Sequence, residues 1–405
     1  MLALTAFTAR LYYLFRSTAY KTFLFDDPKS YWDNAVLIAE NRPPNFYLYH
    51  LFPTFYSLFL AGLHRLLHGF HLDAWKLEIS LGFQALLVSA AGYFVYRIAA
   101  AVLKSHWAAM GASAAFLFSY PAVFMNSLVM PDNFSVPAVI AACWLLLFPA
   151  QTLLTSAAAG ILFGAAAAAK PSFLLMGIVF AGWILLIKDT RRLARVFCFC
   201  LCCAAVLAGT VLFNRNISGG KLTALGANGG INFFQAYCRP SLVRSKSAEG
   251  GSWVRAPLAI GQKKEEFVTD VPFYKQSYFY REGLACIRRE PNVLWERAPL
   301  IKEFISGRFI PEPFAKPLGF DWGMRIHRLA LTVCLGSVLL YVFIPFTRDR
   351  RKMLFLLGIA GVYLATICLL STPERRYFFP AEFVLYTAFF GLFPSIGAAR
   401  KRSTP

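Results

Sequence analysis

Two adjacent carboxylates, Asp26 and Asp27, follow the first short apolar run of the chain. A carboxylate can take a proton from a hydroxyl group during a transfer reaction. Other charged residues stand next to apolar runs, where a charge is costly unless it has a function or a partner. They are Asp132, Lys170, Arg215, Arg375 and Arg376. A carboxylate facing several cations suits transfer from a phosphate-linked donor, because the cations neutralise the phosphate that leaves.

Each candidate also has a structural interpretation. Asp26 and Asp27 could cap the helix that follows, since Pro28 suits its first turn. Asp132 could likewise cap a helix, and Lys170 could be a helix-end lysine whose ammonium reaches towards water. The two late arginines could be interfacial anchors. These alternatives stay open at the level of sequence.

The composition predicts an integral membrane protein. Hydrophobic residues make up 58% of the 405 residues and charged residues 15%, which is too little polar surface to cover a water-soluble globule. The formal net charge is +20, but the basic clusters lie mostly in short loops between apolar runs, at 188–195, 347–352 and 398–402. That placement follows the positive-inside pattern of membrane proteins and argues against a nucleic-acid partner.

The apolar runs predict an all-α polytopic fold with about ten transmembrane helices. The predicted spans are 1–20, 77–103, 107–129, 133–148, 152–169, 173–187, 193–213, 326–346, 354–370 and 378–393. If the N-terminus is cytoplasmic, the basic loops fall inside and the candidate residues fall outside. The first external loop, about 21–76, contains two segments with the pattern of amphipathic helices, 30–41 and 53–67.

The chain then divides into three parts. Residues 1–213 form an N-terminal transmembrane module with the candidate loop, 214–325 a small external α or α/β domain, and 326–405 the last transmembrane helices and a basic tail. The external segment opens with glycine- and asparagine-rich turns, and two helices broken at Pro291 are expected near its end. It contains Cys238 and Cys286, which could pair if the loop is external. The other cysteines show no metal-ligand spacing.

A family resemblance lies in the same segments. The stretch from Asp27 to Ala35, with the later FPTFYSLFLAGL, resembles the first periplasmic loop of GT-C glycosyltransferases. The similarity is greatest to the branch of the protein O-mannosyltransferases and of the aminoarabinose transferases acting on lipid A. Four later segments resemble elements of that family in the same order: VMPDNF, AAAAAKPSFLL, NRNISGG with GGINFF, and PERRYFFPAEFVLY.

The resemblance implies an inverting sugar transfer from a polyprenyl-phosphate donor to an acceptor hydroxyl. It places the general base at Asp27, with Asp26 as the alternative. It implies that Lys170, Arg215, Arg375, Arg376 and Tyr377 bind the donor phosphate. Asp26 and Asp132 could orient the acceptor or the base, or could hold a divalent cation, for which no ligand set is evident. Tyr31 and His50 would orient the acceptor, although His50 could also be an interfacial or packing residue.

The implied acceptor is a glycolipid, a glycan or a protein, in contact with membrane lipids. The expected location is a bacterial inner membrane, with the site on the external face. A transporter or flippase of polyprenyl-linked sugars remains the main alternative, since it would share the spans and the cations but need no base. Its sign would be internal inverted symmetry, which the sequence does not reveal. A structural membrane protein is the third possibility, and it predicts no convergence of acids and cations.

Overall fold

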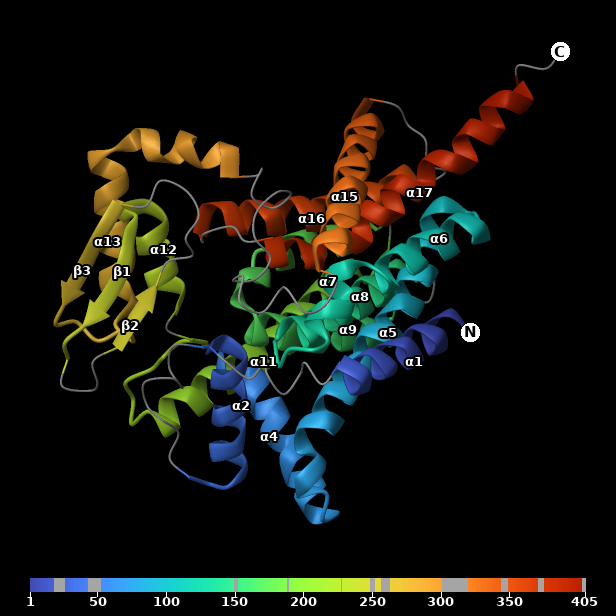
Figure 1. The fold of residues 1–405 in the computed structure, drawn as a ribbon. Coiled ribbons are helices and arrows are strands. Elements are labelled where there is room, and N and C mark those ends of the chain that lie inside the picture. Colours follow the sequence, from blue (N-terminus) through green and yellow to red (C-terminus); the bar gives the residue numbers. More distant parts are fainter. Residues whose placement is uncertain are drawn as a thin grey trace.

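The computed structural model describes residues 1–17, 26–42, 52–148, 152–187, 189–226, 228–247, 252–255, 263–300, 320–343, 349–370 and 375–402. The chain is mostly helical, with a helical bundle and a smaller unit that contains one sheet (Figure 1). The bundle helices are α1 (Leu2–Ser17), α5 (Lys76–Leu103), α6 (His106–Leu117), α7 (Tyr120–Met125), α8 (Asp132–Leu147), α9 (Leu153–Ala169), α10 (Met176–Leu186), α11 (Arg192–Ile217), α15 (Phe320–Phe343), α16 (Arg350–Leu370) and α17 (Phe379–Arg402).

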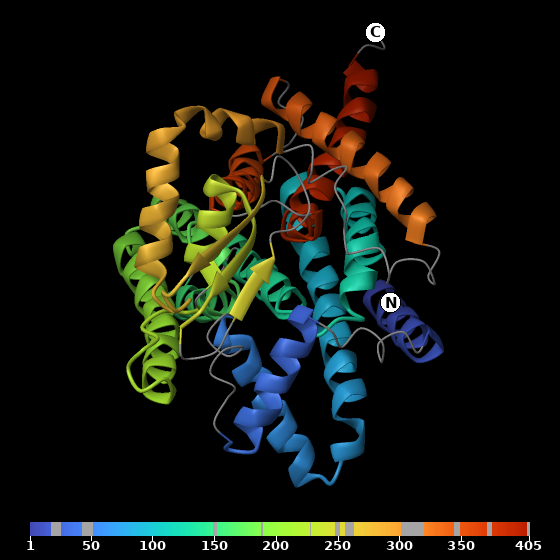
Figure 2. The same ribbon diagram turned by 60° about the vertical axis from the view of Figure 1, so that its left-hand side comes forward.

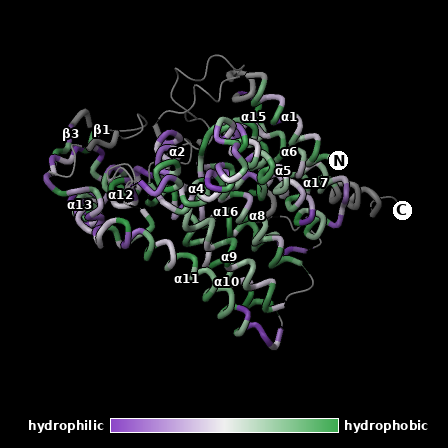
Figure 3. The backbone as a smooth tube through the Cα atoms, turned by 90° about the horizontal axis from the view of Figure 1, so that it is seen from below, coloured by the Kyte–Doolittle hydropathy of each residue, from purple (hydrophilic) through white to green (hydrophobic). Residues whose placement is uncertain are grey.

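Membrane-spanning helices are indicated by length and composition. Among the described residues, three helical segments are long and apolar enough to cross a bilayer: Asp73–Leu103, Arg192–Ile217 and Arg350–Leu370. Five further apolar helices are shorter, between 10 and 17 residues. Figure 3 shows hydrophobic residues along α9, α10 and α11, whereas hydrophilic residues are frequent in the sheet-containing unit. The full count of about ten spans stays a prediction.

The single helix predicted over 107–129 is wrong. α6 ends at Leu117 and a separate helix, α7, begins at Tyr120. The Ser119 side chain caps α7 by accepting from the Ala122 amide, and Pro121 occupies its first turn. The buried Arg10 of α1 donates to the Leu117 carbonyl oxygen, which the helix end leaves without an intrahelical partner.

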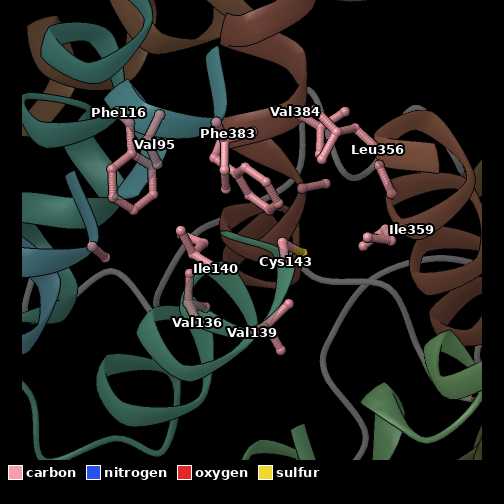
Figure 4. Packing of buried hydrophobic residues seen from close by; sticks show 14 of the residues in the cluster. Val95, Phe116, Val136, Val139, Ile140, Cys143, Leu356, Ile359, Phe383 and Val384 are labelled. Carbon is pink, nitrogen blue, oxygen red and sulfur yellow. The ribbon is translucent and has the colours of Figure 1, made fainter. Parts of the chain in front are cut away.

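The core of the bundle joins helices that are distant in sequence. Figure 4 shows Val95, Phe116, Ile140, Ile359 and Phe383, which belong to one buried cluster and come from α5, α6, α8, α16 and α17. All are almost completely buried, so their apolar surface is removed from solvent in one contiguous cluster.

Helices α9 and α11 approach each other at two glycines. A Cβ atom on Gly160 would lie 2.3 Å from the carbonyl oxygen of Phe199, and one on Gly164 would lie 3.0 Å from the Cα atom of Cys203. The spacing of four residues places both glycines on one face of α9. This is the small-residue pattern by which helix backbones pack closely in membranes.

The first-loop helices lie at one end of the bundle. α2 (Asp26–Ala39) and α4 (Thr54–Gly69) pack against each other, and α4 leads through η2 (Asp73–Trp75) into α5. The guanidinium of Arg65 donates to the carbonyl oxygens of Ile38 and Ala39 at 2.8 and 3.2 Å, which satisfies the C-terminal end of α2. Helices are therefore present at both segments where the sequence predicted them.

The sheet-containing unit comprises α12 (Asn228–Cys238), β1 (Pro240–Ser245), β2 (Ser252–Arg255), β3 (Lys263–Thr269), α13 (Gln276–Arg289) and the 3-10 helix η4 (Pro291–Leu300). The strand order is β2-β1-β3, with β1 antiparallel to β2 and parallel to β3 (Figure 2). Cys238 and Cys286 form a disulfide between α12 and α13. The chain does break before Pro291, and a 3-10 helix follows it.

This unit is fixed to the bundle at the end of α16. Arg297 donates to the carbonyl oxygens of Ala236 and Cys368, both at 2.7 Å. The Tyr237 hydroxyl donates to the Leu369 carbonyl oxygen at 2.7 Å. The last carbonyl groups of a helix lack intrahelical partners, so these donors satisfy them and hold the unit beside the C-terminal end of α16.

Candidate functional site

Asp132 and Lys170 form a buried ion pair. Asp132 is the first residue of α8 and Lys170 directly follows the last residue of α9. The Lys170 ammonium donates to Asp132 Oδ1, and the two side chains are 10% and 3% exposed. Because Pro171 disfavours the helical conformation for the residue before it, Lys170 leaves the helix in an extended conformation. The ammonium turns to Asp132 instead of reaching towards water, so the interpretation of Lys170 as a solvent-reaching lysine is wrong.

Tyr377 lies against the same ammonium group. The Lys170 Nζ atom is 4.8 Å from the centre of the Tyr377 ring and 5.9 Å from that of Phe173. Such contacts stabilise a cation that has lost part of its water shell. Tyr377 belongs to η7 (Arg375–Phe378), which brings the backbone of Arg375 and Arg376 to this end of the bundle. Their side chains lie outside the described part of the structure.

The first-loop helices cover this end. One buried apolar cluster contains Tyr31 from α2, Tyr56 from α4, Met130 from the turn before α8, and Ala169 from the end of α9. Asp27 lies in the first turn of α2 and is partly exposed. The first-loop helices and the Asp132–Lys170 pair therefore meet at one end of the bundle.

The remaining first-loop candidates differ in how far the structure describes them. Tyr31 is buried, and its ring packs against Phe52 and Tyr56 at 5.2 and 5.4 Å, so packing is its observed role. Asp26 begins α2, but its side chain is outside the described set. His50 falls in the segment 43–51, which is likewise outside the described residues.

Arg215 stands in the last turn of α11, on an exposed part of the helix. Its neighbour Asn214 is buried and accepts a hydrogen bond from Thr54, the first residue of α4. Asn214 also donates to the Ala224 carbonyl oxygen at 2.7 Å. The end of α11 is thus tied to the first loop, which keeps Arg215 at the same end of the bundle as Asp132.

A buried polar network next to Asp132 was not predicted. The Tyr56 hydroxyl donates to Gln84 Oε1 at 2.7 Å, and Asn133 Nδ2 donates to the same oxygen at 3.0 Å. All three residues are completely buried. The sequence signal was one amide side chain within the apolar run 77–103 and another at the start of the run 133–148, because a buried polar group needs a hydrogen-bond partner.

A second unpredicted pair joins α15 to α17. His327 Nε2 and Glu382 Oε1 are 2.8 Å apart, and their side chains are 2% and 0% exposed. Glu382 lies one turn beyond Phe378 and so follows the η7 segment directly. An ionisable residue inside the apolar run 378–393 was the signal that could have identified this pair.

No metal centre is evident in the described ranges. Within them, no group of three or more His, Cys, Asp or Glu side chains could hold a metal ion. The described part of the structure therefore offers no ligand set for the divalent cation that the sequence left open.

No protein-family model matches the sequence, and no curated protein matches it significantly.

Proposed function

We propose that this chain is an integral membrane glycosyltransferase of the GT-C type. It transfers a sugar from a polyprenyl-phosphate donor to an acceptor hydroxyl. The observation that carries the proposal is the meeting of three separate segments at one end of the bundle: the first-loop helices, the Asp132–Lys170 pair and the η7 segment with Tyr377. A structural membrane protein would have no need to bury acids and cations together beside a loop that carries further acids.

In the proposed reaction, Asp27 accepts the proton of the acceptor hydroxyl while that oxygen attacks the anomeric carbon. The bond between this carbon and the phosphate oxygen breaks, and the polyprenyl phosphate leaves with the electron pair. A single displacement inverts the configuration at the anomeric carbon. Partial exposure of Asp27 suits a base that must be reached by the hydroxyl group of an incoming acceptor.

The cations stabilise the phosphate that leaves. Asp132 holds the Lys170 ammonium at a fixed place in apolar surroundings, and a preorganised charge stabilises a developing anion without costly rearrangement. Arg215, Arg375 and Arg376 are proposed to add further positive charge, since their backbone positions lie at the same end. Tyr377 lies beside Lys170 and would line the phosphate site.

The proposed location is a bacterial inner membrane, with the site on the external face. The opposite end of the bundle carries basic residues, including Lys104 after α5, Arg191 before α11 and Arg192 at its first position. That end would be cytoplasmic by the positive-inside rule. The disulfide in the sheet-containing unit supports an oxidising compartment for the end that carries the site. About ten spans, the shorter apolar helices included, complete the proposed topology.

The test uses purified protein in lipid nanodiscs with a panel of radiolabelled polyprenyl-phosphate sugars and total membrane glycolipid as acceptor. Wild type is compared with Lys170→Met and with a control, Lys352→Met, whose lysine pairs with Asp349 at the start of α16. We expect label to reach the acceptor with wild type and the control, and transfer to be lost in Lys170→Met. If no donor is consumed but donor crosses the membrane of proteoliposomes, the transporter alternative replaces the enzyme.

A further inference from the structure

Three buried polar side chains connect the first loop to the helix that carries Asp132. Gln84 of α5 accepts hydrogen bonds from Tyr56 of α4 and Asn133 of α8 on a single oxygen, Oε1. Its Nε2 group donates to the Ser80 carbonyl oxygen at 3.4 Å, which agrees with this orientation of the amide. Burying polar groups of this kind costs folding free energy unless they form hydrogen bonds.

Asn133 also holds the turn that precedes Asp132. Its Nδ2 group also donates to the Met125 carbonyl oxygen at 2.6 Å and the Leu128 carbonyl oxygen at 3.0 Å, so its two hydrogens are shared among three acceptors. These two carbonyl groups lie at the end of α7 and in the turn that follows it. The position of Asp132 is therefore fixed by the side chain of the next residue, which is itself fixed by Gln84.

Tyr56 completes the connection on the side of the first loop. Burial and the nearby charge of Asp132 raise the pKa of Tyr56 well above its usual value, so the hydroxyl keeps its proton and stays a donor. The Tyr56 ring also packs edge-on against Tyr31 of α2, 5.4 Å away. A movement of α2 would therefore act on Gln84 through Tyr56.

We infer that Tyr56 and Gln84 are positioning residues, which hold the Asp132–Lys170 pair at a fixed place relative to the first-loop helices. Neither residue is proposed to touch the substrate. The placement of the pair stands on the geometry alone, whereas the consequence for sugar transfer rests on the proposed function. The two parts can therefore fail separately.

The first measurement follows Lys170 itself and does not depend on activity. Acylation of Lys170 by acetic anhydride is quantified by mass spectrometry across a pH range in wild type, Tyr56→Phe and Gln84→Leu. The control is Tyr96→Phe, which removes a similar hydroxyl from the other end of α5, where Tyr96 bonds His106 Nδ1 at 2.8 Å. We expect Lys170 to react about tenfold faster in the first two variants and unchanged in the control, because a loosened buried pair exposes the amine.

The second measurement is transfer by the same variants. Tyr56→Phe keeps the packed ring and leaves the bond between Asn133 and Gln84 in place, so it is the variant whose folding is least at risk. We expect its kcat to fall roughly ten- to hundredfold with a nearly unchanged KM for the donor, since misplacement of a reacting group affects turnover. Altered Lys170 labelling without any transfer in wild type would support the positioning role and refute the proposed function. Unchanged labelling in both variants would overturn the inference, whatever the activity.

Discussion

Lys170 at the end of α9 donates a hydrogen bond to Asp132 at the start of α8, although 38 positions separate them in the sequence. Both side chains are almost excluded from water, so each compensates the charge of the other. The pair lies beside Tyr377, at the end of the bundle that the first-loop helices cover. It is the one charged contact in the described structure on which the proposed reaction depends.

Replacing one residue of this pair is expected to destabilise the protein more than replacing both. We expect Asp132→Asn and Lys170→Met each to cost about 3–5 kcal/mol of unfolding free energy, because each leaves a buried charge without its partner. The double variant should cost less than the sum of the two. Chemical denaturation in detergent measures all three. Additive single effects would show that the two groups do not interact.

Gly160 is expected to tolerate no side chain. Its added Cβ atom would meet the backbone oxygen of Phe199 at 2.3 Å, and a backbone atom cannot move aside as a flexible side chain can. We expect Gly160→Ala to cost about 1–3 kcal/mol. Gly209→Ala in α11 is the control, since nothing lies within 4 Å of its Cβ position. Thermal unfolding should show a loss for the first and no loss for the second, and equal behaviour would contradict the close packing of α9 on α11.

The stability of the first-loop helices should depend on the protonation of His64. Burial, aided by the charge of Lys76, lowers the pKa of His64 to about 4, and both ring nitrogens are buried without a hydrogen-bond partner in the described structure. The unfolded chain, with a pKa near 6.5, therefore binds a proton that the folded chain does not. The neutral state of His64 therefore contributes about 3 kcal/mol to the free energy of unfolding. This contribution is complete above pH ~6.5 and is lost as the pH falls towards 4.

Replacing this histidine should remove that dependence. We expect the unfolding midpoint of His64→Leu to fall less between pH 7 and pH 4.5 than that of wild type. His71→Asn is the control, because His71 is exposed and asparagine tolerates its positive φ angle of 57°. An identical pH profile for wild type and His64→Leu would show that His64 is not held neutral by its surroundings.

The disulfide gives a test of the compartment. The chain has nine cysteines, of which seven are free and two form the Cys238–Cys286 bond. We expect maleimide to label seven cysteines in denatured, unreduced protein isolated from membranes, and nine after reduction. Labelling of nine without reduction would place the sheet-containing unit in a reducing compartment and would contradict the proposed external face.

Much of the helical framework is visible in the sequence, because apolar periodicity is local. The predicted segment 77–103 agrees within one residue with α5, and 152–169 agrees with α9. The break at Ser119 was missed although a serine followed by Pro121 is a helix-start signal, because the apolar run continued through it. The bond from Arg10 to Leu117 depends on two distant helices, so no local pattern could reveal it.

The residues of the candidate site were likewise only partly predictable from the sequence. Charged residues next to apolar runs drew attention to Asp132, Lys170 and the segment of Tyr377, since such residues are rare in that position. The Gln84 network and the His327–Glu382 pair were missed because uncharged or single polar residues inside apolar runs give a weaker signal. The choice between Asp26 and Asp27 as base is a chemical question that sequence patterns do not decide.

The most direct test of the account is the turnover of Asp27→Asn beside that of Asp33→Asn. Both residues lie on α2, and Asp33 forms an exposed pair with Lys29, so its loss controls for the removal of a carboxylate from the same helix. Transfer from the donor identified in the panel is measured in nanodiscs, together with donor binding. We expect Asp27→Asn to lose about a hundredfold or more in turnover with donor binding retained, and Asp33→Asn to resemble wild type. Full turnover in Asp27→Asn would contradict the assignment of Asp27 as the base.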